Sequence, residues 1–263
     1  MSIYEYRPLL IFSVIMAACL GAVAGSFLNC AALRIVHGEP FVKGRSHCPH
    51  CGHVLGPLEL VPVFSWLAQR GRCRACGAKI SPRYPVTELV FALATVLCLL
   101  RFDLTVLCLR NWIFLCCLFC LSLVDLESFT IPDGTLLTAF GAWLLALPFL
   151  RPGWGWIGRQ LLAALVFGGG ILLVSLLMDK LLKKESLGGG DVKLFAVCGL
   201  YLGFAGCLFC MLLACVFGLV FSRLRGAKSG QPFPFSPAIS LAAALMLLYG
   251  DGLVGWYLGL LGL

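Results

Sequence analysis

Long apolar stretches, separated by short polar segments, constrain this chain more than any other feature of its sequence. They lie at about residues 9–33, 86–101, 105–124, 134–150, 158–179, 191–202, 203–222 and 237–262. A helix that crosses a bilayer needs about 20 mostly apolar residues, so the second and sixth stretches are short. With 60% hydrophobic and only 12% charged residues, the chain is too apolar for a compact soluble domain of its length. We therefore expect an all-α polytopic membrane protein with about eight transmembrane helices.

The first apolar stretch has an alternative interpretation as a secretory signal, because it is N-terminal. It lacks a basic start and a small-residue cleavage site, and about 25 residues is long for the apolar part of a signal. We therefore interpret it as the first transmembrane helix.

The distribution of lysine and arginine predicts the orientation of the helices. If the N-terminus lies outside and the loops alternate, 15 of these residues lie on the inner side and five on the outer side. Positively charged loops stay in the cytoplasm. The net charge of +8 then follows from topology and from attraction to anionic inner-leaflet lipids. Because the basic residues are spread over several loops, we expect no nucleic-acid partner.

A long polar loop, between the first two helices at about residues 37–85, carries two CxxC pairs separated by 21 residues. The four cysteines are Cys48, Cys51, Cys73 and Cys76. Four thiolates with this spacing suit one tetrahedral Zn²⁺, and Gly52 and Gly77 follow the pairs where tight turns are needed. Two disulfides are the alternative, but persistent disulfides are rare in the reducing cytoplasm. The sequence therefore predicts a cytoplasmic zinc-binding loop.

Three histidines lie around the first CxxC pair, and any of them could replace a cysteine as a ligand. They are His47, His50 and His53. Because four cysteines already fill a structural site, we expect the histidines to be solvated neighbours and the zinc to be structural rather than catalytic. The other eleven cysteines lie in or beside apolar stretches, where they act as small hydrophobic residues.

Two aspartates lie at the same predicted depth, which makes them candidates for catalysis. Asp125 ends the third apolar stretch on its way inward, and Asp191 opens the sixth on its way outward. An aspartate at the centre of a membrane helix costs about 2.5–3.5 kcal/mol to insert, so it needs an explanation. Other acids have simpler ones: we interpret Asp133 as a helix-start residue and Glu88 as an interfacial charge.

Two neighbouring carboxyl groups can share one proton and act together as acid and base. The ionised one takes a proton from water while the protonated one polarises the scissile carbonyl, as in aspartic proteases. The run Gly188, Gly189 and Gly190 leaves room for a sharp bend and for the close approach of an extended substrate. The alternative is that the glycines only end a loop and that Lys193 only marks the membrane interface.

Six stretches together resemble the bifunctional prepilin peptidases of type IV pilus and type II secretion systems. They are GSFLNCAALR (Gly25–Arg34), the paired CxxC loop, SPRYPVTEL (Ser81–Leu89), VDLESFTIPD (Val124–Asp133), GGGDVKL (Gly188–Leu194) and PFSP (Pro234–Pro237). The resemblance implies a G-x-G-D intramembrane aspartyl protease with Asp125 and Asp191 as its catalytic pair. It also implies a first part, residues 1–85, that contains the zinc loop and the methyltransferase, and a peptidase domain over residues 86–263.

The resemblance further implies a substrate, a cofactor and a location. Enzymes of this family sit in the bacterial inner membrane, cut the leader from type 4 prepilins or pseudopilins at the cytoplasmic face, and methylate the new N-terminus with S-adenosylmethionine. The sequence departs from the family at Ser236, where glycine is usual, and at Leu60, where asparagine is expected. A peptidase without methyltransferase activity is one alternative, and a transporter that uses Asp125 and Asp191 as ion sites is another.

Overall fold

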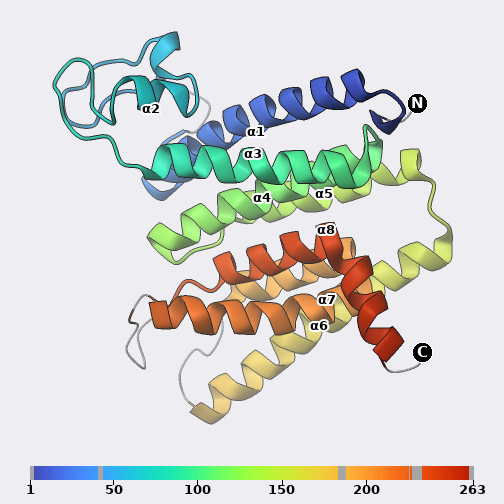
Figure 1. Ribbon diagram of the computed structural model, residues 1–263. Coiled ribbons are helices and arrows are strands. Elements are labelled where there is room, and N and C mark those ends of the chain that lie inside the picture. Colours follow the sequence, from blue (N-terminus) through green and yellow to red (C-terminus); the bar gives the residue numbers. More distant parts are fainter. Residues whose placement is uncertain (1–2, 41–43, 183–187, 225, 227–232, 261–263) are drawn as a thin grey trace. The chain divides into compact units, whose positions relative to one another are not determined.

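The computed structural model describes residues 3–40, 44–182, 188–224, 226 and 233–260, and its regular elements there are all helical (Figure 1). The long helices are α1 (Arg7–Val36), α3 (Arg83–Phe102), α4 (Val106–Ser128), α5 (Asp133–Leu150), α6 (Trp154–Leu182), α7 (Gly189–Leu224) and α8 (Ser236–Leu260). The short ones are η1 (Ile3–Glu5), η2 (Pro57–Glu59) and α2 (Phe64–Ala68). All seven long helices are long and apolar enough to cross a membrane.

Helix α7 consists of two arms that fold back on each other at Gly203. That glycine has non-helical backbone angles (φ 68°, ψ −172°), which a residue with a side chain rarely adopts. The thiol of Cys207 lies 3.8 Å from the carbonyl oxygen of Phe195, although 12 residues of straight helix would span about 18 Å. The two arms are the predicted sixth and seventh spans, so the expectation of about eight membrane-crossing segments is confirmed.

The chain forms two compact units, Met1–Cys108 and Leu109–Leu263. The first unit therefore contains α3, which the sequence analysis assigned to the peptidase domain. The assignment of the two activities to residues 1–85 and 86–263 stays a prediction.

In the first unit, α1 packs on α3 through a stripe of mostly small residues at every fourth position. The buried members of this stripe are Ser13, Ala17, Gly21, Gly25 and Asn29. A Cβ atom at Gly21 would lie 2.6 Å from the Thr95 hydroxyl and 2.7 Å from the Ala92 Cα. Small residues let membrane helices approach closely, so the glycines set the distance between α1 and α3.

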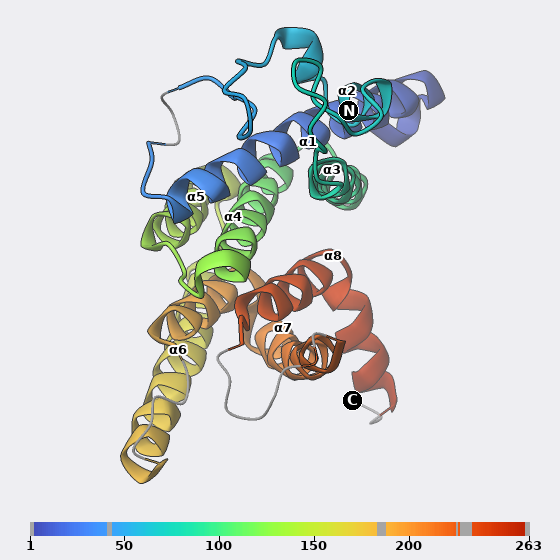
Figure 2. The same cartoon turned by 90° about the vertical axis from the view of Figure 1, so that its left-hand side faces the viewer.

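In the second unit, α6 and α8 both pack on α7, and α5 also contacts α7 (Figures 1 and 2). The first arm of α7 forms the centre, with Leu194, Phe195 and Cys198 buried. The Tyr201 hydroxyl donates a hydrogen bond to the carbonyl oxygen of Ala139 in α5, at 2.7 Å. The same ring stacks on Phe114 of α4, with ring centroids 3.9 Å apart. Tyr201 thus ties α4, α5 and α7 together.

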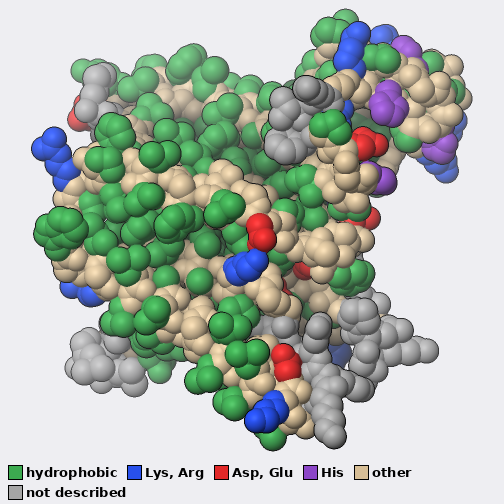
Figure 3. All heavy atoms as spheres, turned by 180° about the vertical axis from the view of Figure 1, so that it is seen from behind, with side chains coloured by type: hydrophobic (Ala, Val, Ile, Leu, Met, Phe, Trp, Pro, Cys, Tyr) green, Lys and Arg blue, Asp and Glu red, His purple; other side chains and the backbone are tan. Residues whose placement is uncertain are grey.

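The surface has the pattern expected of a membrane protein. Figure 3 shows hydrophobic side chains spread over the long helices, whereas histidine and basic side chains gather over the polar segment around α2. Large apolar side chains such as Leu145 and Phe149 are more than two-thirds exposed on α5. Lipid contact accounts for apolar exposure of this extent.

Candidate active site and metal centre

Asp125 lies in the last turns of α4 and is buried, with 5% of its surface exposed. The backbone N–H of Ser236, the first residue of α8, donates a hydrogen bond to its Oδ2 at 3.1 Å. A backbone donor has a fixed direction, and a bond to a charged acceptor is about twice as strong as a neutral one. The start of α8 therefore holds the Asp125 carboxylate in place.

Asp191 lies in the first turn of α7. Its backbone N–H donates to the carbonyl oxygen of Gly188 at 3.0 Å, and its side chain is partly buried. The residue before it, Gly190, packs closely on Ile131, six residues after Asp125: a Cβ atom at Gly190 would lie 2.8 Å from the Ile131 Cβ. The two acids that the sequence analysis singled out therefore lie at the same end of the second unit.

The three glycines before Asp191 have different surroundings. A Cβ atom at Gly190 would lie 2.8 Å from the Cβ of Ile131, in the segment between α4 and α5. Among the described residues, no atom lies within 4 Å of a Cβ at Gly189, and at Gly188 only the Asp191 carboxylate does, at 3.7 Å. Gly190 is thus needed for packing, whereas the described residues leave space at Gly188 and Gly189.

Lys193 forms an ion pair with Asp133. Its Nζ lies 2.7 Å from the Asp133 Oδ1, and both side chains are more than half exposed. Asp133 is the first residue of α5, in agreement with its prediction as a helix-start residue. The pair connects the start of α5 to the start of α7. Lys193 is close in sequence to Asp191, and Asp133 is close in sequence to Asp125.

The four cysteines of the polar loop come together in one cluster. The sulfur atoms of Cys48, Cys51, Cys73 and Cys76 all lie within 4.8 Å of one another. Tetrahedral zinc–thiolate bonds of about 2.3 Å place the sulfurs roughly 3.8 Å apart, and the Cys48 and Cys76 sulfurs are 3.9 Å apart. A disulfide needs about 2.05 Å, and all four cysteines are free. The cluster fits a single tetrahedral metal ion.

Each CxxC pair forms the same small turn. In the first, the N–H of Cys48 donates to the carbonyl of His53, and the N–H of Gly52 donates to the carbonyl of Cys48. In the second, Cys73 and Gly77 make the equivalent bonds. Gly52 and Gly77 both have positive φ, 71° and 72°, as expected for the turn positions that the sequence analysis assigned to glycine.

The two thiols of the first CxxC pair have opposite pKa shifts. Hydrogen bonds from backbone N–H groups, first that of Cys51 and then that of His50, lower the pKa of the Cys48 thiol to about 7. The pKa of the Cys51 thiol is raised to about 12: a backbone hydrogen bond at His53 lowers it, but burial and the neighbouring thiols raise it by more. Among the described residues the metal-ligand cluster contains only cysteines. His53 instead contacts Glu59, with Nε2 and Oε2 3.2 Å apart. Four thiolates complete the ligand set, as expected for a structural zinc site.

Glu88 is a buried acid whose role the sequence did not reveal. It is 6% exposed in the first turns of α3, although we expected an interfacial charge. Its Oε2 accepts a hydrogen bond from the backbone N–H of Val63 at 2.7 Å. Val63 precedes α2 and has φ of 63°, an unfavourable conformation for a β-branched residue. The hydrogen bond to Glu88 therefore connects α3 to Val63, a residue of the polar loop with an unfavourable backbone conformation.

Comparison with known proteins gives matches over almost the whole chain. Residues 19–102 match the family described as Bacterial Peptidase A24 N-terminal domain, and residues 112–223 match the Type IV leader peptidase family. A prepilin leader peptidase/N-methyltransferase of Bacillus subtilis is 33% identical over 242 residues, which cover 90% of this chain and 95% of that protein. The chain belongs to the type IV leader peptidase family.

Further members of the type IV leader peptidase family bear the same name. The protein of Aeromonas hydrophila is 36% identical, over 81% of this chain and 74% of its own length. That of Pseudomonas aeruginosa is 31% identical, over 95% of this chain and 94% of its own length. No solved structure matches the chain. Family membership and the apolar helices together show a multi-pass membrane protein.

Of the two departures from the expected sequence pattern, Ser236 contacts Asp125 through its backbone N–H, a donor that serine and glycine supply equally. Its hydroxyl oxygen is buried and has no hydrogen-bond partner among the described residues. The side chain of Leu60 is 43% exposed, and nothing in the structure explains its replacement of asparagine.

Proposed function

We propose that this chain is an intramembrane aspartic endopeptidase that removes the leader of type 4 prepilins or pseudopilins at the cytoplasmic face of the membrane. We further propose that it then methylates the new N-terminus with S-adenosylmethionine. The observation that supports the proposal is that Asp125 and Asp191 lie at one end of the second unit, where Gly190 packs on Ile131 and the start of α8 donates to Asp125. The names of the family members that match the chain supply the substrate class.

The two carboxyl groups suit hydrolysis by an activated water molecule. With one proton between them, the ionised group takes a proton from water as the water attacks the scissile carbonyl carbon, and the protonated group donates to the carbonyl oxygen. Collapse of the tetrahedral intermediate then breaks the C–N bond: the departing amine takes the proton that the first group drew from water, and a hydroxyl of the intermediate returns a proton to the second group. The Ser236 N–H keeps the Asp125 carboxylate oriented through these steps.

The cytoplasmic location follows from the charge of the loops. Counting α7 as two crossings, the end of α4, the start of α7 and the start of α8 lie on the same side of the membrane as the cysteine loop. That side holds 15 of the 20 basic residues, and basic loops stay inside. A substrate with a hydrophilic leader and an apolar segment would then present its junction to the two aspartates at the interface.

The zinc ion would be held by the four cysteine thiolates and would stabilise the polar loop. That loop has few buried apolar side chains of its own, and small domains of this kind depend on metal for their folding. The ion would have no part in peptide hydrolysis, because four thiolates leave no position for water or substrate.

For methyl transfer we propose the first unit. Asn29 there is fully buried, and neither atom of its side-chain amide has a hydrogen-bond partner among the described residues. An unsatisfied buried amide of this kind is a candidate contact for a bound polar molecule, and Asn29 would help to hold the methyl donor. S-adenosylmethionine supplies an electrophilic methyl group to the free N-terminal amine.

The direct test is incubation of the purified, detergent-solubilised protein with a prepilin, with and without S-adenosylmethionine. Asp125→Asn and Asp191→Asn should each reduce leader removal by at least about 100-fold, the lower range for loss of acid–base catalysis. Glu127→Gln is the matched control, because Glu127 is exposed in the same last turn of α4 and should leave cleavage intact. Normal cleavage by either aspartate variant would refute the assignment.

Mass spectrometry of the processed N-terminus tests the second activity. A methyl group that is present only when S-adenosylmethionine was added supports the bifunctional assignment. A product that is cleaved but never methylated would identify a peptidase without methyltransferase activity.

A further inference from the structure

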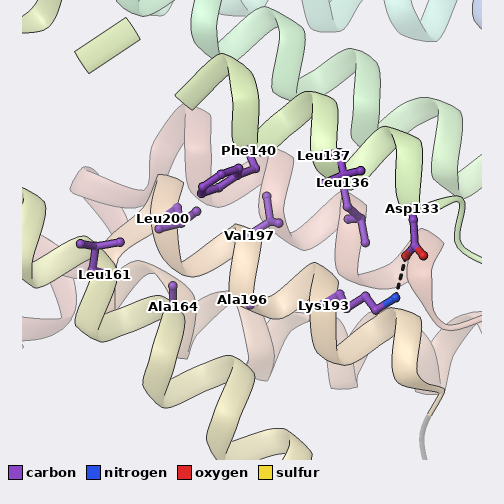
Figure 4. A pocket seen from close by; sticks show the side chains of 10 residues that line it. All are labelled: Asp133, Leu136, Leu137, Phe140, Leu161, Ala164, Lys193, Ala196, Val197 and Leu200. Atoms are coloured by element: carbon purple, nitrogen blue, oxygen red, sulfur yellow. Dashed lines mark hydrogen bonds and ion pairs between the residues drawn. The ribbon is translucent and has the colours of Figure 1, made fainter. Parts of the chain in front are cut away.

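A groove opens on the second unit between α5, α6 and the first arm of α7 (Figure 4). Its lining is Asp133, Leu136, Leu137 and Phe140 from α5, Leu161 and Ala164 from α6, and Lys193, Ala196, Val197 and Leu200 from α7. It is open along one side and has a volume of about 520 Å³.

The groove exists because α5 and α6 lie apart from each other on the surface of α7. Both α5 and α6 pack on α7, but the described parts of α5 and α6 pack little on each other. Along the floor, the α7 residues Lys193, Ala196, Val197 and Leu200 follow one helical face, and seven residues of helix span about 10 Å, or two turns. The floor is low because Ala164 and Ala196 are small. The open space thus has the length and direction of two turns of an added helix.

The polarity of the groove changes from one end to the other. Among the described residues that line it, the charged ones are Asp133 and Lys193, which pair at 2.7 Å at the end where both helices start (Figure 4). Because these two neutralise each other, the described lining beyond them is uncharged. A partner that matches this pattern has an uncharged apolar helix that continues into a polar segment at that end.

The polar end of the groove lies next to the proposed catalytic acids. Lys193 is two residues from Asp191 along α7, and the Ile131 side chain that covers Gly190 comes just before Asp133 in the chain. A chain leaving the groove would reach Gly188 and Gly189, whose missing side chains leave room, as far as the described residues go, beside the Asp191 carboxylate. A helix in the groove would therefore lead its polar extension toward the site.

We propose that this groove binds the apolar N-terminal helix of the prepilin substrate, with the leader running past the Asp133–Lys193 pair toward Asp191. The inference rests on the proposed function and adds to it a binding surface for the substrate. It explains how the enzyme would find the junction of leader and apolar segment: the helix stops where the groove becomes polar. A lipid acyl chain is the other possible occupant, and the experiment separates the two.

Leu161 and Leu162 provide a matched pair for a photo-crosslinking test. Both are leucines at the same depth on α6, with 48% and 57% exposure, but only Leu161 lines the groove. Benzoylphenylalanine would be introduced at each position in an Asp191→Asn background, which keeps the prepilin uncleaved, in vesicles of phosphatidylethanolamine and phosphatidylglycerol. We expect prepilin crosslinks from position 161 and at least several-fold fewer from position 162. Equal crosslinking, none at either position, or phospholipid adducts alone at position 161 would overturn the proposal.

Kinetics of Leu161→Trp and Leu162→Trp in the active enzyme provide a second, independent readout. Filling the groove should raise KM for full-length prepilin about 10-fold in Leu161→Trp, with little change in Leu162→Trp, because lost apolar contact of about 1.4 kcal/mol corresponds to a factor of ten. Similar KM values for the two variants would refute the binding of the substrate helix in the groove, while leaving the proposed function intact. If the wild-type enzyme removed no leader at all, the proposed function itself would fail.

Discussion

The backbone N–H of Ser236 donates to the Asp125 carboxylate at 3.1 Å, across 111 residues of sequence. It connects the start of α8 to the end of α4, inside the second unit. Because Ser236 occupies the first position of α8, proline suits the helix there and removes the donor, while its ring enters a fully buried position beside the Asp125 carboxylate.

Ser236→Pro should therefore lower the rate of leader removal selectively. A hydrogen bond to a charged group contributes about 1.5–3 kcal/mol, so we expect a decrease of about 10- to 100-fold in kcat. Ser236→Gly and Ser236→Ala retain the N–H and should stay within a few-fold of wild type, as measured by the rate of prepilin cleavage. A Ser236→Ala variant as impaired as Ser236→Pro would show that the hydroxyl, and not the backbone, is the important group.

Gly190→Ala should strain the junction of α7 with the segment before α5. Its new Cβ would meet three atoms of Ile131 at 2.8–3.1 Å, and overpacking of this kind costs about 1–3 kcal/mol. We expect a lower thermal unfolding midpoint and reduced cleavage. Ile131→Ala in the same protein removes two of the three atoms and should restore part of both. Gly189→Ala is the control, because no atom lies within 4 Å of its Cβ position.

The sequence predicted the features of this site that depend on local pattern. Apolar length located the spans, and the alternation of crossings put Asp125 and Asp191 at one depth; in the structure the start of α7 contacts the segment that follows Asp125. The CxxC spacing predicted the cysteine cluster, because each pair forms its own turn. The turn at Gly203 was also visible as the boundary between two apolar stretches.

The remaining features depend on contacts between distant segments, which no local pattern encodes. The donor to Asp125 comes from Ser236, and the partner of Gly190 is Ile131, far away in the sequence. The burial of Glu88 likewise depends on where Val63 lies in the folded loop. From its position near the end of an apolar stretch, Glu88 is indistinguishable from a charge at the membrane interface. Only the folded polar loop buries it and supplies its hydrogen-bond donor.

The cysteine cluster should contain one zinc ion per chain. Elemental analysis of protein purified without chelators measures the metal directly. Cys48→Ser and Cys73→Ser should each lose it and loosen residues 44–82 in hydrogen exchange, because zinc binding is coupled to folding in small metal domains. Cys215→Ser, in the second arm of α7, is the control that should keep the metal.

The same variants test the division of labour between the two parts of the chain. We expect Cys48→Ser to reduce methylation more than leader removal, both measured on one prepilin sample. Equal and complete loss of both activities would contradict that division.

Glu88→Ala should release the polar loop from α3. It removes the acceptor of the Val63 N–H, and leaving a buried donor without a partner costs about 1–3 kcal/mol. Faster amide exchange at residues 57–70 is the expected result. Glu88→Gln keeps an acceptor oxygen and should have a smaller effect, so equal exchange in the two variants would show that the bond does not hold the loop.

Gly21→Ala should push α1 away from α3. Its Cβ would lie 2.6–2.8 Å from two side-chain atoms of Thr95 and the backbone Cα of Ala92. Because the Ala92 contact is with backbone, α3 would have to move. Gly141→Ala in α5 is the matched control, since that Cβ meets nothing within 4 Å, and alanine favours helix over glycine by about 1 kcal/mol. Thermal unfolding in detergent should therefore show a lower midpoint for Gly21→Ala and an unchanged or higher one for Gly141→Ala. Equal midpoints for the two variants would mean that α1 and α3 do not depend on the close approach at Gly21.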